Sequence, residues 1–199
     1  MNFELLVATN NANKLKEIRQ ILSPHHITVY GMKDLNIDIG EVEENGNTYF
    51  DNALIKARAL QKETKMPIIA DDTGLEIVAM DNKPGLYTAR YAESLGGHKE
   101  AFKDIFKNIE GKDRTAYFVC SIVLVNVEDK PLKFEARIPG HIATEVSGEE
   151  GFGYDPIFIC DEVGKTYALM GQEEKNRVSH RGKALKKLLT YLKINNYIL

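Results

Sequence analysis

The sequence predicts an α/β fold, built on an elongated mixed β-sheet with flanking helices. Short apolar strands alternate with amphipathic helices in the first half, and two longer strands joined by a polar turn follow in the second. Strand–helix alternation favours parallel pairing, whereas strands joined by a short turn pair antiparallel. Because no repeat, low-complexity tract or long linker interrupts the chain, residues 1–199 are interpreted as one domain.

Local patterns predict the elements of the first half. Apolar runs bounded by polar residues indicate strands at 3–8, 27–30, 67–70 and 75–79, with Asp71-Asp72-Thr73-Gly74 between the last two. The first helix follows Asn13, and an acidic loop at 38–47 precedes a second helix that runs from Thr48 to about residue 63. Thr48 and Asp51 form a variant capping box at its start. A turn at 82–85 and an amphipathic helix at 99–109 complete this half.

The second half is expected to open with an antiparallel hairpin, in which strands at 115–127 and 132–138 are joined by a polar turn around Asp129. A glycine-rich loop follows at 148–156. The last helix is expected at 179–192, with Ser179 as a plausible N-cap and an apolar face that faces inward. That face consists of Ala184, Leu185, Leu188 and Leu192.

Composition excludes several classes of protein. The net charge of −3 argues against a general affinity for nucleic acid, so any binding of phosphates requires a local cluster of donors and cations. No run of 18 apolar residues is present, and the first residues lack the pattern of a signal peptide. Cys120 and Cys160 lack metal-ligand spacing and are interpreted as reduced thiols. We therefore expect a cytoplasmic protein without nucleic-acid or membrane partners.

Two segments contain polar residues directly after a buried strand. The first runs from Thr9 to Lys14, where the N–H groups of a helix start offer an anion site; a capped helix start with a solvated lysine explains it equally well. The second is the pair Asp71 and Asp72, whose side chains should point to opposite faces of a strand. With Glu41, Glu43 and Glu44 of the acidic loop, they suit Mg²⁺, which binds one or two carboxylates plus substrate phosphates. A turn-forming Asp and a solvated loop remain the alternative.

Three further groups of residues are candidates for substrate binding. Thr48, Asn52 and Lys56 form one polar stripe on the second helix, although such stripes are more often solvated. Lys175, His180 and Arg181 surround the start of the last helix, where cations are unfavourable unless an anion lies in front of them. Phe152 and Tyr154 offer flat rings to a nucleobase, with ordinary packing as the alternative.

In this order, the segments resemble the inosine triphosphate pyrophosphatase family, which hydrolyses non-canonical purine nucleoside triphosphates. The resemblance runs from Leu6 to Leu192 and rests on ATNNANKLKEI, ENGNTYFDNALIKA, ADDTGLEI, GLYTARY, GFGYDPIF and EEKNRVSHRGKAL. Each segment is weak alone, but together they are specific. The resemblance implies two lobes around a central cleft, a homodimer, magnesium as the cofactor and a purine nucleoside triphosphate such as ITP, dITP or XTP as the substrate.

The resemblance also implies a role for individual residues. Asp72 and Lys56 would be catalytic, with Asp72 as proton acceptor; Glu43 and Asp72 would bind the metal, supported by Glu44 and Asp71. Substrate contacts fall on Thr9, Asn10, Asn11, Ala12, Asn13, Lys14, Thr73, Phe152, Gly153, Tyr154, Asp155, Lys175, His180 and Arg181. Asn10 stands where many members have Gly, and Thr73 replaces a frequent Ser.

The resulting hypothesis is attack of water on the α-phosphorus, which releases the nucleoside monophosphate and pyrophosphate. Lysine and arginine only donate hydrogen bonds, so they suit the O6 acceptor of inosine or xanthosine better than the 6-amino group of adenine. Two alternatives stay open at this point: a Maf-like pyrophosphatase for other modified nucleotides, and a nucleotide-binding sensor that does not hydrolyse its ligand.

Overall fold

The computed structural model describes residues 2–199. Its strands are β1 (Phe3–Val7), β2 (Ile27–Gly31), β3 (Ile68–Ile77), β4 (Lys83–Pro84), β5 (Thr115–Val125), β6 (Leu132–Ile142), β7 (Phe158–Cys160) and β8 (Lys165–Thr166). Its α-helices are α1 (Ala12–Leu22), α2 (Tyr49–Gln61), α3 (Thr88–Ser94), α4 (His98–Asn108), α5 (Gln172–Val178) and α6 (His180–Ile194). Within the described residues, no helix is long and apolar enough to cross a membrane.

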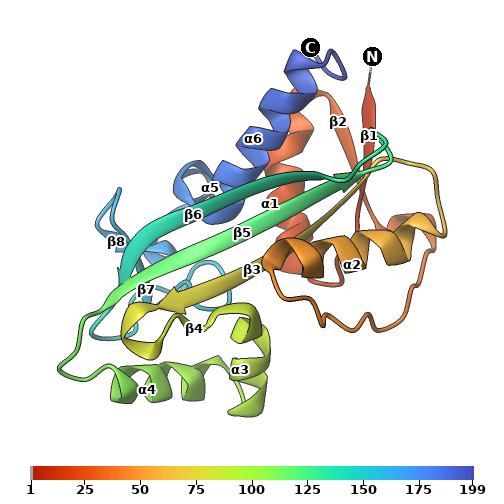
Figure 1. Cartoon of the computed structure of the whole chain (residues 1–199). Helices are drawn as coiled ribbons and strands as arrows, with labels where there is room; N and C mark the ends of the chain where they lie inside the picture. The colour runs from red at the N-terminus through yellow and green to blue at the C-terminus, as the bar shows by residue number, and fades with distance from the viewer. Residues whose placement is uncertain (1) are drawn as a thin grey trace. The chain divides into compact units, whose positions relative to one another are not determined.

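The strands form one mixed sheet in the order β2-β1-β3-β5-β6-β7-β8, with β4 paired to β3 (Figure 1). β1 pairs in parallel with both β2 and β3, whereas the pairs β3–β4, β6–β7 and β7–β8 are antiparallel. β5 and β6 are neighbours joined by residues 126–131, a connection too short for a parallel crossover. The predicted mixed α/β sheet is therefore confirmed.

The chain divides into two compact units. The first contains Met1–Asp72, Cys120–Glu135 and Lys183–Leu199, and the second contains Thr73–Val119 and Ala136–Gly182. Strands β3, β5 and β6 and helix α6 contribute residues to both units. The interpretation of residues 1–199 as a single domain stays a prediction.

In the first unit, α2 packs its apolar face against the parallel strands. The shared core consists of Leu6, Ala8, Met32, Ala53, Ala57, Leu60, Ile68, Ala70, Val123 and Val125. The helix begins where the Thr48 hydroxyl accepts the Asp51 N–H, as the capping pattern predicts. The predicted inward face of α6 is also buried. Burial of these faces stabilises both helices far more than their intrinsic propensities do.

In the second unit, an aromatic cluster forms much of the core. The ring centroids of Phe118 and Phe158 lie 5.0 Å apart, and those of Phe158 and Tyr167 lie 5.1 Å apart. Helix α4 buries Ala101, Phe102 and Ile105, the spacing that predicts its amphipathic character. This unit also contains α3, α5, β7 and β8, which the sequence patterns do not indicate.

One expectation about the strands is wrong. The structure has a single strand, β3, in place of two strands at 67–70 and 75–79 with a turn at Asp71–Gly74 between them. Two adjacent aspartates interrupt an apolar pattern, but distant lysines compensate their charges and the strand continues. The expected turn at 82–85 includes β4, which pairs with β3 at Glu76 and Ile77.

The close pairing of β6 with β7 gives a first testable prediction. A Cβ atom on Gly140 would lie 2.2 Å from the Ile159 carbonyl oxygen and 2.5 Å from Cζ of Phe158. Gly140→Ala should therefore lower the free energy of unfolding by about 1–3 kcal/mol, the usual cost of overpacking. His141→Ala, at an exposed neighbouring position, is the control in urea denaturation. Equal stability of the two variants would show that the strands separate without cost.

Candidate active site

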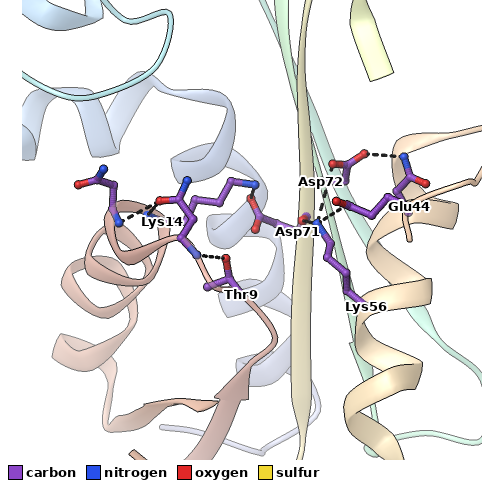
Figure 2. A network of polar contacts seen from close by, with 9 residues as sticks. Thr9, Lys14, Glu44, Lys56, Asp71 and Asp72 are labelled. Atoms are coloured by element: carbon purple, nitrogen blue, oxygen red, sulfur yellow. Dashed lines mark hydrogen bonds and ion pairs between the residues drawn. The ribbon is translucent and has the colours of Figure 1, made fainter. Parts of the chain in front are cut away.

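The strand β3 presents two buried carboxylates to opposite faces of the sheet. Asp71 and Asp72 are consecutive, and side chains alternate along a strand. Asp71 points toward α1, whereas Asp72 points toward α2 (Figure 2). The Lys14 Nζ lies 3.2 Å from Asp71 Oδ2, and the Lys56 Nζ lies 3.9 Å from Asp72 Oδ1. The predicted divergence of the two aspartates is confirmed, and each carboxylate has a lysine from the helix on its own side.

The Asp71 carboxylate faces the polar residues at the start of α1 (Figure 2). The Asn11 Oδ1 caps the helix by accepting the N–H groups of Asn13 and Lys14, at 3.0 and 3.1 Å. The Thr9 hydroxyl accepts the Asn11 N–H at 3.1 Å and so shapes the turn between β1 and the helix. These local bonds hold the backbone of 9–14 in place at the carboxyl end of β1. Asn10, Ala12 and Asn13 are exposed, and Asn10 does not adopt a positive φ.

Lys56 is the centre of the network on the Asp72 side. Its Nζ donates to the Asp71 backbone oxygen at 2.6 Å and lies 2.7 Å from the Glu44 Oε1. Burial lowers the pKa of Lys56, but the carboxylates of Asp71, Asp72 and Glu44 outweigh it, so the net shift is upward. Lys56 therefore remains charged at neutral pH.

For Asp72, in contrast to Lys56, burial is the largest cause of the upward shift in pKa. Burial, and to a lesser extent the nearby Glu44 carboxylate, raises the pKa of Asp72, and together they exceed the lowering by Lys56 and Lys14 and by the hydrogen bond from Asn52. The net shift is upward, which makes the ionised carboxylate a better proton acceptor than an exposed aspartate.

The oxygen atoms around Lys56 have the chemistry that Mg²⁺ prefers. Asp72 and Glu44 supply hard carboxylate oxygens beside Lys56, without cysteine or histidine ligands, whereas the Asp71 carboxylate lies beside Lys14 on the other face of the strand. Glu43 is exposed in the same loop. Among residues 2–199, no group of three or more acidic, histidine or cysteine side chains is gathered to hold a metal by itself. This donor set fits a cation that substrate phosphates help to bind.

The second unit contains the other predicted residues. The Asp155 Oδ2 accepts the Phe152 N–H at 2.9 Å and lies 2.6 Å from the Lys175 Nζ, and both side chains of this ion pair are less than 5% exposed. The Phe152 ring has two cations nearby, with the Lys175 Nζ 4.7 Å and the Arg181 Cζ 5.7 Å from its centroid. The glycine-rich loop is thus tied to the α5–α6 corner by one carboxylate and two cation–π contacts.

His180 and Tyr154 are held by packing within this unit. The His180 ring stacks on Phe118, with centroids 4.2 Å apart and planes within 7°. Ser179 caps α6 by accepting the Gly182 N–H, as predicted. The Tyr154 ring is 3% exposed, and its hydroxyl donates to the Thr88 carbonyl oxygen. Tyr154 therefore supports the loop from inside, and Phe152 presents the more accessible ring. Thr73 is half-buried on β3, and Gly153 has a φ of 65° in the loop.

Sequence reasoning missed the role of two residues in these networks. Asn52 appears in the sequence only as part of a polar stripe, yet it donates to Asp72 Oδ2 at 3.2 Å. Thr88 links β3 to α3, because its hydroxyl accepts the Leu75 N–H and donates to the Gly85 carbonyl oxygen. The spacing of Asn52 one helical turn before Lys56 is a signal for the first; no local pattern indicates the second.

Comparisons with known proteins find relatives over nearly the whole chain. The dITP/XTP pyrophosphatase of Caldanaerobacter subterraneus subsp. tengcongensis is 44% identical over 192 residues, 94% of this chain and 95% of that protein. The dITP/XTP pyrophosphatase of Bacillus subtilis is 39% identical over 188 residues, 93% of this chain and 94% of that protein.

Solved structures and a family model point the same way. A HAM1 protein from Coxiella burnetii has a TM-score of 0.85 at 36% identity, with 96% of this chain and 98% of that chain covered. The Ham1 protein of Staphylococcus aureus has a TM-score of 0.84 at 35% identity, with 96% and 99% covered. The model of the Ham1 family matches residues 5–191. This chain belongs to the Ham1 family.

Proposed function

We propose that this chain hydrolyses non-canonical purine nucleoside triphosphates, in the dITP/XTP class, to the monophosphate and pyrophosphate. Relatives that match it over nearly their whole length carry the name dITP/XTP pyrophosphatase. The observation that carries the proposal is the pair of buried, diverging aspartates on β3, each facing a lysine from the adjacent helix. This arrangement combines lysine cations, which can bind phosphates, with a carboxylate, which can accept a proton from water.

We assign binding of the triphosphate to residues of the first unit. Lys14 and Lys56 supply positive charge, and the N–H groups and hydroxyl at Thr9–Lys14 supply neutral donors at a helix N-terminus. Positive charge here stabilises the negative charge that develops on the phosphoryl oxygens during transfer.

Magnesium is the proposed cofactor, held by Asp72 and Glu43 with support from Glu44 and Asp71. The ion would polarise the phosphoryl oxygens and neutralise part of the triphosphate charge. Glu44 reaches the site from the loop at 38–47, where it contacts Lys56 of α2, and Glu43 precedes it in the same loop.

Asp72 is the proposed general base. It orients a water molecule and accepts its proton while the water oxygen bonds to the α-phosphorus. The bond between the α-phosphorus and the bridging oxygen breaks, and the electron pair leaves with pyrophosphate. Burial raises the pKa of Asp72, which brings its basicity closer to the operating pH.

We assign recognition of the purine base to residues of the second unit. Lys175 and Arg181 only donate, so either favours a 6-keto oxygen over the 6-amino group of adenine. Phe152 supplies a ring for stacking, and Asp155 holds both Phe152 and Lys175 in place. Removing the complementary acceptor would leave buried donors unpaired, which is how such sites discriminate strongly.

The proposal extends to assembly and location. A homodimer in the cytoplasm is the state that the family resemblance implies. The exposed apolar side chains of Tyr87 and Leu95, which flank the two ends of α3, support an interface on the second unit.

The activity itself is the first prediction of this function. Pyrophosphate should be released from ITP and XTP with a higher kcat/KM than from ATP, EDTA should abolish release and Mg²⁺ should restore it. In ¹⁸O-labelled water, the label should appear in the monophosphate, because water attacks the α-phosphorus. Release of orthophosphate, or full activity without a divalent cation, would contradict the proposal.

Substitution of the general base gives the second prediction. Asp72→Asn should lower kcat by about 10²–10⁴-fold, because the amide neither accepts a proton nor balances the metal charge. Asp129→Asn, at an exposed aspartate in the β5–β6 connection, should leave kcat unchanged. A rate for Asp72→Asn within a few-fold of wild type would remove Asp72 from the mechanism.

The Asp72→Asn variant should also retain the fold. Burial raises the pKa of Asp72, so its ionised form costs folding free energy at neutral pH, and the amide avoids this cost. In metal-free buffer, the Tm of Asp72→Asn should equal or exceed that of wild type. The difference should shrink as pH falls toward the ordinary pKa range of aspartate, where the native carboxyl is protonated.

Base selection gives the third prediction. Arg181→Gln should lower kcat/KM for ITP more than for ATP, because a charge-assisted bond of about 1.5–3 kcal/mol is lost only with the keto base. The ratio of the two kcat/KM values should therefore fall by an order of magnitude or more, and Arg181→Lys should retain part of it. An equal loss for both nucleotides would assign Arg181 to a phosphate instead.

A further inference from the structure

Asn52 on α2 is only 4% exposed, yet its amide is hydrogen-bonded on two sides. Its Oδ1 accepts the Gly46 N–H at 2.8 Å, and its Nδ2 donates to Asp72 Oδ2 at 3.2 Å. A backbone N–H can only donate, so the amide oxygen must face Gly46 and the amide nitrogen must face Asp72. The two bonds therefore leave the side chain a single orientation.

The loop at 38–47 can approach Asn52 because Gly46 has no side chain. A Cβ atom on Gly46 would lie 2.8 Å from the Asn52 Oδ1 and 2.5 Å from the Asp51 Cβ. Lys56, one helical turn after Asn52, makes a second tie through Glu44 in the loop and the Asp71 carbonyl oxygen on β3. One face of α2 thus connects the acidic loop to β3 twice.

We propose that Asn52 is a positioning residue, which sets the Asp72 carboxylate and the acidic loop in register with each other. This inference rests on the proposed function, in which Asp72 and the loop glutamates serve the same magnesium-bound triphosphate. Asn52 acts through Asp72 and Gly46 and not on the reacting atoms. Without it, the Asp72 carboxylate loses the donor that fixes its rotation, and the loop loses its anchor beside β3.

The size of the effect follows from the behaviour of comparable residues. Hydrogen-bond partners that orient metal-binding side chains typically change metal affinity or activity by about 10–100-fold when they are replaced. A residue that only stabilised the fold would instead lower the Tm and leave the rate per folded molecule and the response to magnesium unchanged. A positioning role therefore alters the rate and the response to magnesium, whereas a purely structural role alters the Tm.

The test compares three variants with wild type. Asn52→Leu removes both hydrogen bonds and keeps the branched shape and the number of side-chain heavy atoms, and Gly46→Ala disturbs the same link from the loop side. Asn47→Ala changes an exposed asparagine in the same segment and serves as the control. Two quantities are measured: kcat for ITP at saturating Mg²⁺, and calorimetric affinity for an α,β-methylene analogue of ITP with Mg²⁺ and with EDTA.

Asn52→Leu should lower kcat and the Mg²⁺-dependent gain in analogue affinity by about 10–100-fold each. Affinity in EDTA should stay near the wild-type value, Gly46→Ala should show a smaller loss of the same kind, and Asn47→Ala should show none. If Asn52→Leu does not fold, Gly46→Ala decides by the same two measurements.

Two results would overturn the inference. One is a kcat and a Mg²⁺-dependent gain within about twofold of wild type in both variants, well below the range expected for such residues. The other is an equal loss of affinity with and without Mg²⁺, which would mean a general structural role. Failure of wild type to release pyrophosphate would refute the proposed function alone, because analogue binding still tests Asn52.

Discussion

Two adjacent carboxylates in a buried strand impose the constraint on which the first unit depends. Removing an ionised carboxylate from water costs several kcal/mol unless a counter-charge and hydrogen bonds replace the water. The alternation of β3 sends Asp71 and Asp72 to opposite faces, so one cation cannot serve both equally. Lys14 on α1 supplies the counter-charge for Asp71, and Lys56 on α2 supplies it for Asp72. The positions of both helices on the sheet are thus coupled to the same two residues of one strand.

The compensation is incomplete at Asp72, and this agrees with a catalytic role. Its pKa is raised by burial in spite of two nearby lysines, which means that the ionised form is less stable in the folded protein than in water. A protein selected for stability alone would replace such a residue. Retaining it makes sense where an under-stabilised carboxylate is useful as a base, and perturbed carboxylates of this kind concentrate at functional sites.

The parts of the fold that the sequence predicts are those that depend on nearby residues. The Thr48 and Ser179 caps, the apolar face of α6 and the β5–β6 pair are set by residues a few positions apart. The continuity of β3 was not predictable in this way, because it depends on lysines far away in the sequence. Helix α5 and strands β7 and β8 are too short for periodicity to show. The same distinction holds for the site, where the divergence of the aspartates follows from strand geometry but the Asn52 bridge needs the fold.

The glycines of the 148–156 loop permit close contacts within the loop. Gly151 has a φ of 76°, and a Cβ atom there would lie 2.0 Å from the Asp155 Oδ2. The glycine is needed because this carboxylate folds back onto its own loop, where it accepts the Phe152 N–H and pairs with Lys175. Since breaking a buried ion pair of this kind costs about 3–5 kcal/mol, the loop is held firmly in spite of its glycines. A loop held in this way suits the base selection proposed above, because donors discriminate between a keto and an amino group only if they cannot move to accommodate the wrong one.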